Sequence, residues 1–123
     1  MRVVLRIGGS VVASPINAEL MNKYANLLVA LKNKGHEVAA VVGGGGLARE
    51  FISAAKDLGL PEKEKDEMAI SISRLFAQLF LKKLGNMGCS DVPRTIEEAC
   101  ECFRAGKIVV MGGLRPGMTT VDR

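Results

Sequence analysis

Residues 37–46 (EVAAVVGGGG) combine the two features that decide the fold, an apolar run and four consecutive glycines. The apolar run over residues 37–42 is nearly continuous, which is typical of a parallel β-strand that is covered on both faces. The glycines follow at once, at the point where such a strand turns into a helix. A strand ending in a glycine-rich turn predicts an α/β protein whose ligands bind beyond the carboxyl ends of its strands.

The alternation of apolar runs and helical stretches continues along the rest of the chain. Residues 2–7 (RVVLRI) and 107–111 (KIVVM) predict two more strands, and residues 86–90 predict a weak one. Helices are predicted from apolar spacing and capping residues, from Asn17 to Gly35 and over residues 47–58, 62–84 and 96–105. We therefore expect a three-layer α/β/α sandwich with a mainly parallel central sheet and right-handed crossovers.

Length and composition indicate one globular domain over residues 1–123. The chain is 48% hydrophobic, which excludes a disordered protein. Its net charge of +4 is spread along the sequence and suits an anionic small ligand. Aromatic residues are scarce (Phe 4, Tyr 1, Trp 0) and there is no basic run, so we expect no nucleic-acid partner.

The shortness of the apolar segments points to a cytoplasmic protein. The number of cysteines, three, is odd, and points to reduced thiols. The first apolar run, residues 3–5, is far below the roughly 20 residues that cross a bilayer, so no membrane partner is expected. The spacing of Cys89, Cys100 and Cys102 predicts reduced structural thiols and no metal site. His36, beside Gly35, is interpreted as a surface turn residue and not as a catalytic base.

Glycines cluster after each of the three main predicted strands. They form Gly8-Gly9, followed by Ser10, then the quartet at 43–46, and finally Gly112-Gly113 with Gly117. Glycine lets backbone N–H groups approach an anion, and a following helix adds partial positive charge. A tight turn is the simpler explanation for any single loop. Three loops at one sheet edge favour phosphate binding, to a long polyphosphate or to two phosphorylated ligands end to end.

Two other phosphate-binding motifs fit this sequence less well. Gly43-x-Gly45-x-x-Ala48 matches a dinucleotide fingerprint, and Asp66 lies near the distance of a ribose-binding acid. That fingerprint belongs to the first strand–helix turn, however, and its acid ends the next strand, whereas Asp66 begins a predicted helix. A Walker loop is excluded, because no Gly-Lys-Ser/Thr follows any glycine run.

Several cationic and hydroxyl side chains accompany the glycine loops. Arg49 follows the quartet and can fold back over the same anion site, since a guanidinium suits phosphate geometry. Arg6 is expected on a buried strand, where a charge needs a partner such as a ligand anion. Arg74 is expected on the polar side of its helix, reaching a phosphate or facing water. Positioning and charge neutralisation with little acid–base chemistry fit phosphoryl transfer.

Three motifs together resemble the amino acid kinase family. They are Ile7-Gly8-Gly9-Ser10, then Val42-Gly43-Gly44-Gly45 leading to Leu47-Ala48-Arg49, and Met111-Gly112-Gly113 running to Pro116-Gly117-Met118-Thr119-Thr120. The similarity covers the whole chain in register and is greatest to the archaeal-type uridylate (UMP) kinases of that family. It implies transfer of the ATP γ-phosphate to UMP in pyrimidine nucleotide biosynthesis, with Mg²⁺ carried by the nucleotide, in a cytoplasmic homohexamer.

The resemblance also implies roles for individual residues. On the ATP side it places Gly8, Gly9, Ser10, Gly45 and Arg49. On the UMP side it places Gly44, Asp66 at the ribose hydroxyls, and Leu114, Arg115, Pro116, Gly117, Met118, Thr119 and Thr120 around the base and phosphate. Arg6 occupies the place of a family lysine that neutralises charge on the transferring phosphoryl group, so it is the expected catalytic residue. Arg74 assists the acceptor phosphate, and no residue is expected to hold a metal.

The chain departs from the family pattern after Thr120. Family members continue through Asp-Ala into an alanine-rich helix and a second half with the adenine pocket, whereas here Val121-Asp122-Arg123 follow. This predicts the first half of a single-domain kinase, as a fragment, a shortened version or an aberrant terminus. The alternative is a non-catalytic nucleotide-binding or assembly fragment. An amino-acid or small-acid kinase would share the first two loops but not the pattern at 114–120.

Overall fold

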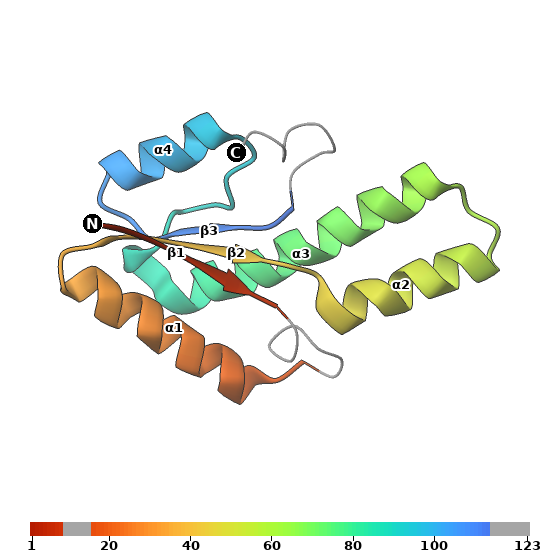
Figure 1. Cartoon of the computed structure of the whole chain (residues 1–123), viewed down its shortest axis with the longest axis horizontal. Coiled ribbons are helices and arrows are strands. Elements are labelled where there is room, and N and C mark those ends of the chain that lie inside the picture. The colour runs from red at the N-terminus through yellow and green to blue at the C-terminus, as the bar shows by residue number, and fades with distance from the viewer. Residues whose placement is uncertain (9–15, 114–123) are drawn as a thin grey trace.

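Three parallel strands form the sheet of this protein, whose computed structural model describes residues 1–8 and 16–113. Their order is β1 (Arg2–Ile7), β2 (Glu37–Val42) and β3 (Val109–Met111) (Figure 1). Ile7 pairs with Val42 and Val41 pairs with Met111, so the carboxyl ends of all three strands meet at one edge. The parallel sheet confirms the predicted α/β class and brings the three glycine loops to that edge.

The described residues form four α-helices beside the sheet. They are α1 (Ala18–Asn33), α2 (Gly45–Asp57), α3 (Glu62–Leu84) and α4 (Ile96–Arg104), and the 3₁₀ turn η2 (Gly85–Met87) follows α3. Local chemistry explains where they begin and end. The Asn17 side chain accepts a hydrogen bond from the Leu20 amide, and Thr95 accepts one from the Glu98 amide. Gly85 ends α3 with φ of 62°, a conformation that favours glycine.

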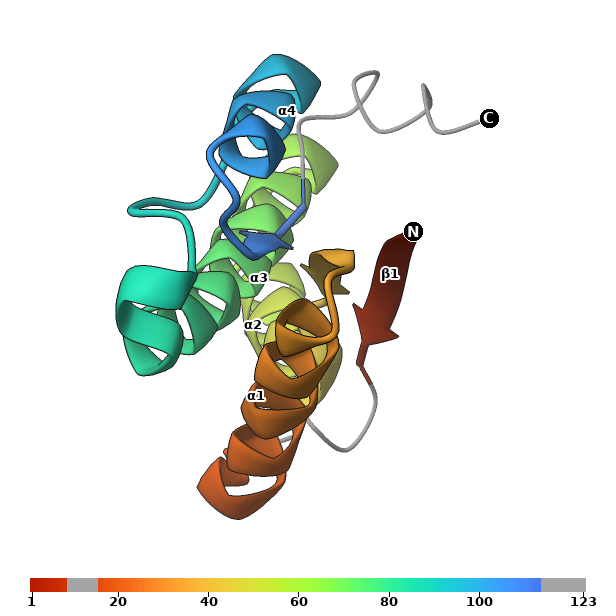
Figure 2. The same ribbon diagram turned by 90° about the vertical axis from the view of Figure 1, so that its left-hand side faces the viewer.

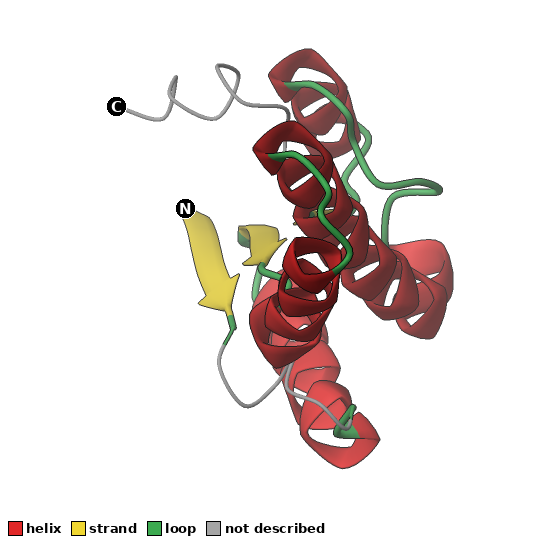
Figure 3. Ribbon diagram, turned by 90° about the vertical axis from the view of Figure 1, so that its right-hand side faces the viewer, coloured by secondary structure: helices red, strands yellow, loops and turns green. Residues whose placement is uncertain are grey.

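The helices form layers on the two sides of the sheet. Viewed along the strands, α1 and α4 lie on opposite sides of the sheet (Figure 2). The strand next to the N-terminus, β1, lies farthest from the helices (Figure 3). On β2 the alternate residues Val38, Ala40 and Val42 are fully buried. They belong to one core with Leu28 of α1 and Phe80 of α3. This core packs β2 and β3 against α3.

β1 is an edge strand, which corrects one premise of the sequence interpretation. Arg6 was expected on a buried strand, but its side chain is exposed, as is that of Val4, which is 55% exposed on the same face. The physical reason is that, within residues 1–8 and 16–113, β1 pairs with β2 alone and the helices leave its outer side chains uncovered. Arg6 therefore needs no buried counter-charge.

The segment between α3 and α4 also differs from the sequence prediction. The weak strand expected over residues 86–90 is absent: residues 85–87 form η2, and only Gly88 makes a single bridge to Ile108. β3 begins two residues later than predicted, because the Lys107 amide closes the end of α4 by bonding to the Cys102 carbonyl.

Two of the three cysteines are paired, so the prediction of three reduced thiols is wrong. Cys89 and Cys102 form a disulfide with Cα atoms 5.9 Å apart, within the usual range, and Cys100 is free. The bridge between Gly88 and Ile108 brings Cys89 beside the end of α4. Sequence spacing could not reveal this contact, since it depends on how α4 packs against β3.

In the described residues no helix is both long and apolar enough to cross a membrane.

Candidate nucleotide-binding site

A hollow lies at the carboxyl edge of the sheet, between the strand ends and α3. Its lining comes from the ends of β1 and β2, the residues that follow these two strands, one face of α3 and the second residue after β3. The lining residues are Arg6, Ile7, Gly8, Val41, Val42, Gly43, Gly44, Ala69, Ile70, Ser73 and Gly113. The topology thus brings together residues from all three glycine loops, as the sequence predicted for a ligand site at this edge.

The start of α2 supplies backbone donors beside this hollow. The residue at its N-cap, Gly44, has no side chain that could accept a hydrogen bond from the first amides of the helix. In α1, by contrast, the side chain of Asn17 accepts such a bond. The amides of Gly45, Gly46 and Leu47 fall in the first turn, where a helix offers them no internal acceptor. Uncapped amides and the positive end of the helix dipole favour an anion at this position.

The glycines at this edge differ in what surrounds them. A Cβ atom added at Gly8 or Gly43 would meet nothing within 4 Å, so these positions are open to a ligand. At Gly44 it would lie 2.5 Å from the Cβ atom of Ala48, and at Gly112 it would lie 2.7 Å from backbone atoms of Arg74. Gly44 and Gly112 are therefore required for packing, which the sequence alone could not separate from phosphate binding.

Sequence reasoning missed Ser73, which lies in the wall of the hollow. It is 4% exposed, and its hydroxyl donates to the Ile70 carbonyl at 2.7 Å while accepting from the Gly113 amide at 2.6 Å. The Gly113 amide is thus already bonded and is not free for a phosphate. The signal for Ser73 was present: it is polar, yet it lies one helical turn from Ala77 and two from Phe80 on the buried side of α3.

Arg74 does not take the position that its place in the sequence suggested. Its guanidinium donates to the carbonyl oxygens of Val92 and Pro93, each at 3.0 Å. The half-buried side chain therefore ties α3 to the segment before α4. An assisting role at the acceptor phosphate, or simple exposure to water, does not match these contacts.

Arg49 and Asp66 are both exposed and lie on the two antiparallel helices beside the hollow. Arg49 is near the start of α2. Asp66 is three and four residues before Ala69 and Ile70, so it shares the helical face of α3 that lines the hollow one turn further along. Within the described part of the chain, neither side chain makes a hydrogen bond or ion pair to another residue.

Several predicted site residues lie outside the described residues. These are Gly9, Ser10, Leu114, Arg115, Pro116, Gly117, Met118, Thr119 and Thr120, and their roles stay predictions. His36 precedes β2 and so lies at the opposite edge of the sheet from the hollow, as expected for a turn residue. Among residues 1–8 and 16–113, no group of three His, Cys, Asp or Glu side chains is arranged to hold a metal ion.

Known proteins resemble this chain in sequence and in structure. Over 98% of its length it is 42% identical to the uridylate kinase of Haloquadratum walsbyi and 44% identical to that of Methanocaldococcus jannaschii. These matches cover 50% and 54% of the two relatives. The crystal structure of the uridylate kinase from Archaeoglobus fulgidus superposes with a TM-score of 0.84 at 37% identity, covering 95% of this chain and 53% of that one.

The chain therefore spans about half the length of the curated relatives it matches. A model of the amino acid kinase family matches residues 1–122. The parallel sheet, its glycine-rich carboxyl edge and the likeness of the whole fold agree with that match. This chain belongs to the amino acid kinase family.

Proposed function

We propose that this chain carries the UMP site and the ATP phosphate site of a UMP kinase, which transfers the γ-phosphoryl group of ATP to UMP. The observation that carries the proposal is one hollow. It is lined by Arg6, by glycines from the three loops and by the face of α3 that lies one turn after Asp66. The similarity to proteins named uridylate kinase supports UMP as the acceptor. The reaction would serve pyrimidine nucleotide biosynthesis in the cytoplasm.

The proposed chemistry is an in-line exchange of one phosphorus–oxygen bond for another. An oxygen of the UMP phosphate bonds to the γ-phosphorus, and the bond to the bridging oxygen breaks, leaving its electron pair on ADP. Such a transfer depends on positioning and on neutralising negative charge. Arg6, exposed at the rim of the hollow, is the residue we assign to the charge on the transferring group.

We assign the ATP phosphates to Gly8, Gly9, Ser10, Gly45 and Arg49. The open surroundings of Gly8 and the uncapped start of α2 support this side of the assignment. Mg²⁺ would arrive with ATP and supply further positive charge on the phosphates. We propose no protein ligand for it.

We assign UMP to the α3 side of the hollow. An exposed carboxylate such as Asp66 suits the two hydroxyls of a ribose, because it can accept a hydrogen bond from each. Gly44 would contact the UMP phosphate, and residues 114–120 would surround the base and phosphate.

A coupled assay that follows ADP formation tests the reaction. We expect turnover with UMP and clearly less with CMP or AMP. Equal or better use of another acceptor would refute the assignment to UMP. An alternative function is nucleotide binding or assembly without catalysis. UMP binding with no ATP-dependent product would support this alternative.

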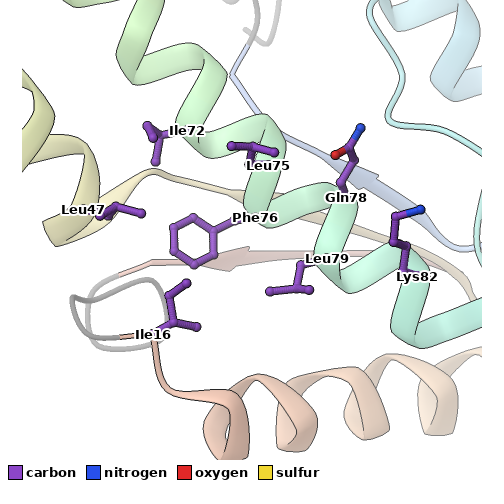
Figure 4. Close-up of a pocket in the computed structure, with 8 residues that line it drawn as sticks. All are labelled: Ile16, Leu47, Ile72, Leu75, Phe76, Gln78, Leu79 and Lys82. Atoms are coloured by element: carbon purple, nitrogen blue, oxygen red, sulfur yellow. The ribbon is translucent and has the colours of Figure 1, made fainter.

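We also propose that copies of the chain associate, as subunits of a homohexamer. An apolar groove runs along α3, where Leu75 is 59% exposed and Leu79 is 45% exposed (Figure 4). Ile16 and Leu47 line its other side. The side chains drawn in Figure 4 are Ile16, Leu47, Ile72, Leu75, Phe76, Gln78, Leu79 and Lys82.

The charges of α3 favour a second copy as the partner in this groove. The first two turns of α3 (residues 62–67, EKEKDE) hold four acidic residues and two lysines, of which Lys65 pairs with Glu62, and Lys82 and Lys83 lie in its last turn. Two antiparallel copies of α3 related by a two-fold axis would place the acids of one against the lysines of the other. The apolar centre of α3 in one copy would then be covered by the apolar centre of α3 in the other copy.

A further inference from the structure

We propose that the disulfide between Cys89 and Cys102 is a redox-sensitive latch for the hollow. When oxidised it holds α4 and residues 88–93 in place, and its reduction by a dithiol lowers the affinity of the hollow for nucleotides. The inference rests on the proposed function, which supplies both the nucleotides and the cytoplasmic location. Disulfides are rare in that compartment, and those that form there usually serve catalysis or redox sensing.

A cavity beside the end of α4 gives a reductant access to the disulfide. Both Cys89 and Cys102 line this cavity, whose volume is about 450 Å³. Cys102 is half-buried, whereas Cys89 is only 4% exposed. An incoming thiolate therefore reaches the sulfur of Cys102 more readily than that of Cys89.

The reduction exchanges one sulfur–sulfur bond for another. A thiolate of the dithiol bonds to the Sγ atom of Cys102, and the bond between the two cysteines breaks. Its electron pair stays on the Sγ atom of Cys89, which takes a proton. The second thiol of the reductant then displaces Cys102 as a thiol and closes a disulfide within the reductant. Two electrons and two protons have then passed to the protein.

The packing of α4 explains why this helix depends on the disulfide. It has nine residues, and isolated helices shorter than about 12–15 residues are marginal in water. Its buried residue is the small Ala99, and the ring of Phe103 lies 4.5 Å from the guanidinium carbon of Arg2. Since these contacts are few, loss of the covalent link should free the end of α4 before the rest of the fold.

Residues 88–93 connect the latch to α3. Cys89 lies three residues before Val92, whose carbonyl accepts a hydrogen bond from the Arg74 guanidinium at 3.0 Å. The Pro93 carbonyl accepts a second one at 3.0 Å. Once this segment is no longer linked to α4, its carbonyls are held less firmly, and the tie between it and α3 weakens.

Arg74 lies where α3 forms the wall of the hollow. Its neighbour Ser73 and the preceding Ile70 line that wall. Gly112 packs so closely on Arg74 that an added Cβ would lie 2.7 Å from its backbone. A shift of this part of α3 therefore changes the shape of the hollow, and a preorganised site binds its ligand more tightly than a loose one.

The test uses the full chain with Cys100→Ser, which keeps the pair and removes the free thiol that could exchange with it. Titration with a thiol reagent in denaturant should find no thiol before reduction with dithiothreitol and two afterwards. Two thiols in the protein as prepared in air would show that the latch does not form, and would overturn the proposal.

Hydrogen exchange distinguishes a local latch from a cross-link that only stabilises the whole fold. The Cys89 amide bonds to the Ile108 carbonyl, and the Lys107 amide bonds to the Cys102 carbonyl. Reduction should accelerate exchange at Cys89 and Lys107 more than at Gly43, which lies at the end of β2. Equal acceleration at all three amides would overturn the proposal.

Calorimetry with UMP and with ATP measures the effect on the hollow. We expect reduction to weaken nucleotide binding about fivefold or more, which is the lower end of typical coupling between two sites. Oxidised glutathione, added after the reductant is removed, should restore the affinity. Cys102→Ser should bind as weakly as the reduced protein and should not respond to dithiothreitol.

Unchanged affinity in a reduced protein whose α4 exchanges faster would overturn the inference alone. An oxidised protein that binds neither nucleotide would overturn the proposed function together with this inference.

Discussion

Single glycines at the carboxyl edge of the sheet have two different physical tasks. Gly8 has empty space where a side chain would be, so its lack of a Cβ atom serves whatever enters the hollow. Gly112 has the backbone of α3 in that space, so its lack of a Cβ atom serves the packing of β3 against the helix. Gly8 and Gly112 should therefore respond differently to the same substitution by alanine.

Gly112→Ala should reduce the free energy of unfolding by about 1–3 kcal/mol, because the new methyl group forces β3 and α3 apart. Gly8→Ala is the matched control: it should leave stability nearly unchanged and weaken ATP binding instead. Urea denaturation of both variants measures the first effect and calorimetry the second. Equal loss of stability in the two variants would contradict this division of the glycines.

Asp66→Asn should weaken UMP binding by about 1–3 kcal/mol, the usual loss for a charge-assisted hydrogen bond. ATP binding should hardly change, because Asp66 lies on α3, one turn before the residues that line the hollow, whereas the residues assigned to ATP lie after β1 and at the start of α2. Asp57→Asn, an equal change at the end of α2, is the control. If calorimetry finds ATP binding reduced instead, the two sites have been assigned in reverse.

Among the elements, helices were predicted well because their signals are local. The Asn17 cap, the glycines at 35 and 85 and the apolar stripes of α1 and α3 all act within one or two turns. Strands and pairings between distant residues were predicted less well. The residues of the Ser73–Gly113 hydrogen bond are 40 positions apart in the sequence, so the packing of β3 against α3 decides whether that bond forms.

The disulfide between Cys89 and Cys102 joins two elements, the segment after η2 and the end of α4. A cross-link spanning 13 residues is expected to stabilise the fold by about 3 kcal/mol in oxidising buffer. Urea denaturation with and without a thiol reductant measures this difference. Cys100→Ser should behave like the parent protein, whereas Cys102→Ser should lose the response to reductant. An equal reductant effect in Cys102→Ser would contradict the pairing.

At the scale of the whole molecule, the fold class, the sheet edge and the family could be predicted from the sequence. The three glycine motifs carry that information because each must follow a strand directly. The exposure of Arg6 could not be predicted, because the pattern RVVLRI is the same for a central strand and for an edge strand, and the strand order is needed to distinguish them. Arg74 likewise needed the position of residues 92–93 before its partners could be identified.

Self-association through α3 is tested by Leu75→Glu, which places a charge at the centre of the apolar groove. We expect light scattering after size-exclusion chromatography to show loss of the larger species. Leu58→Glu is the control, since Leu58 is 77% exposed at the end of α2 and does not line the groove. An unchanged mass for Leu75→Glu would refute α3 as the interface.

The central claim is that the hollow at the carboxyl edge of the sheet binds UMP. Nuclear magnetic resonance of the labelled chain during a UMP titration tests it most directly. The account predicts shifts of the amide signals of Gly8, Gly44 and Asp66, while those of His36 and Cys102, at the opposite edge, stay in place. No shift at saturating UMP, or shifts confined to the opposite edge, would contradict the claim.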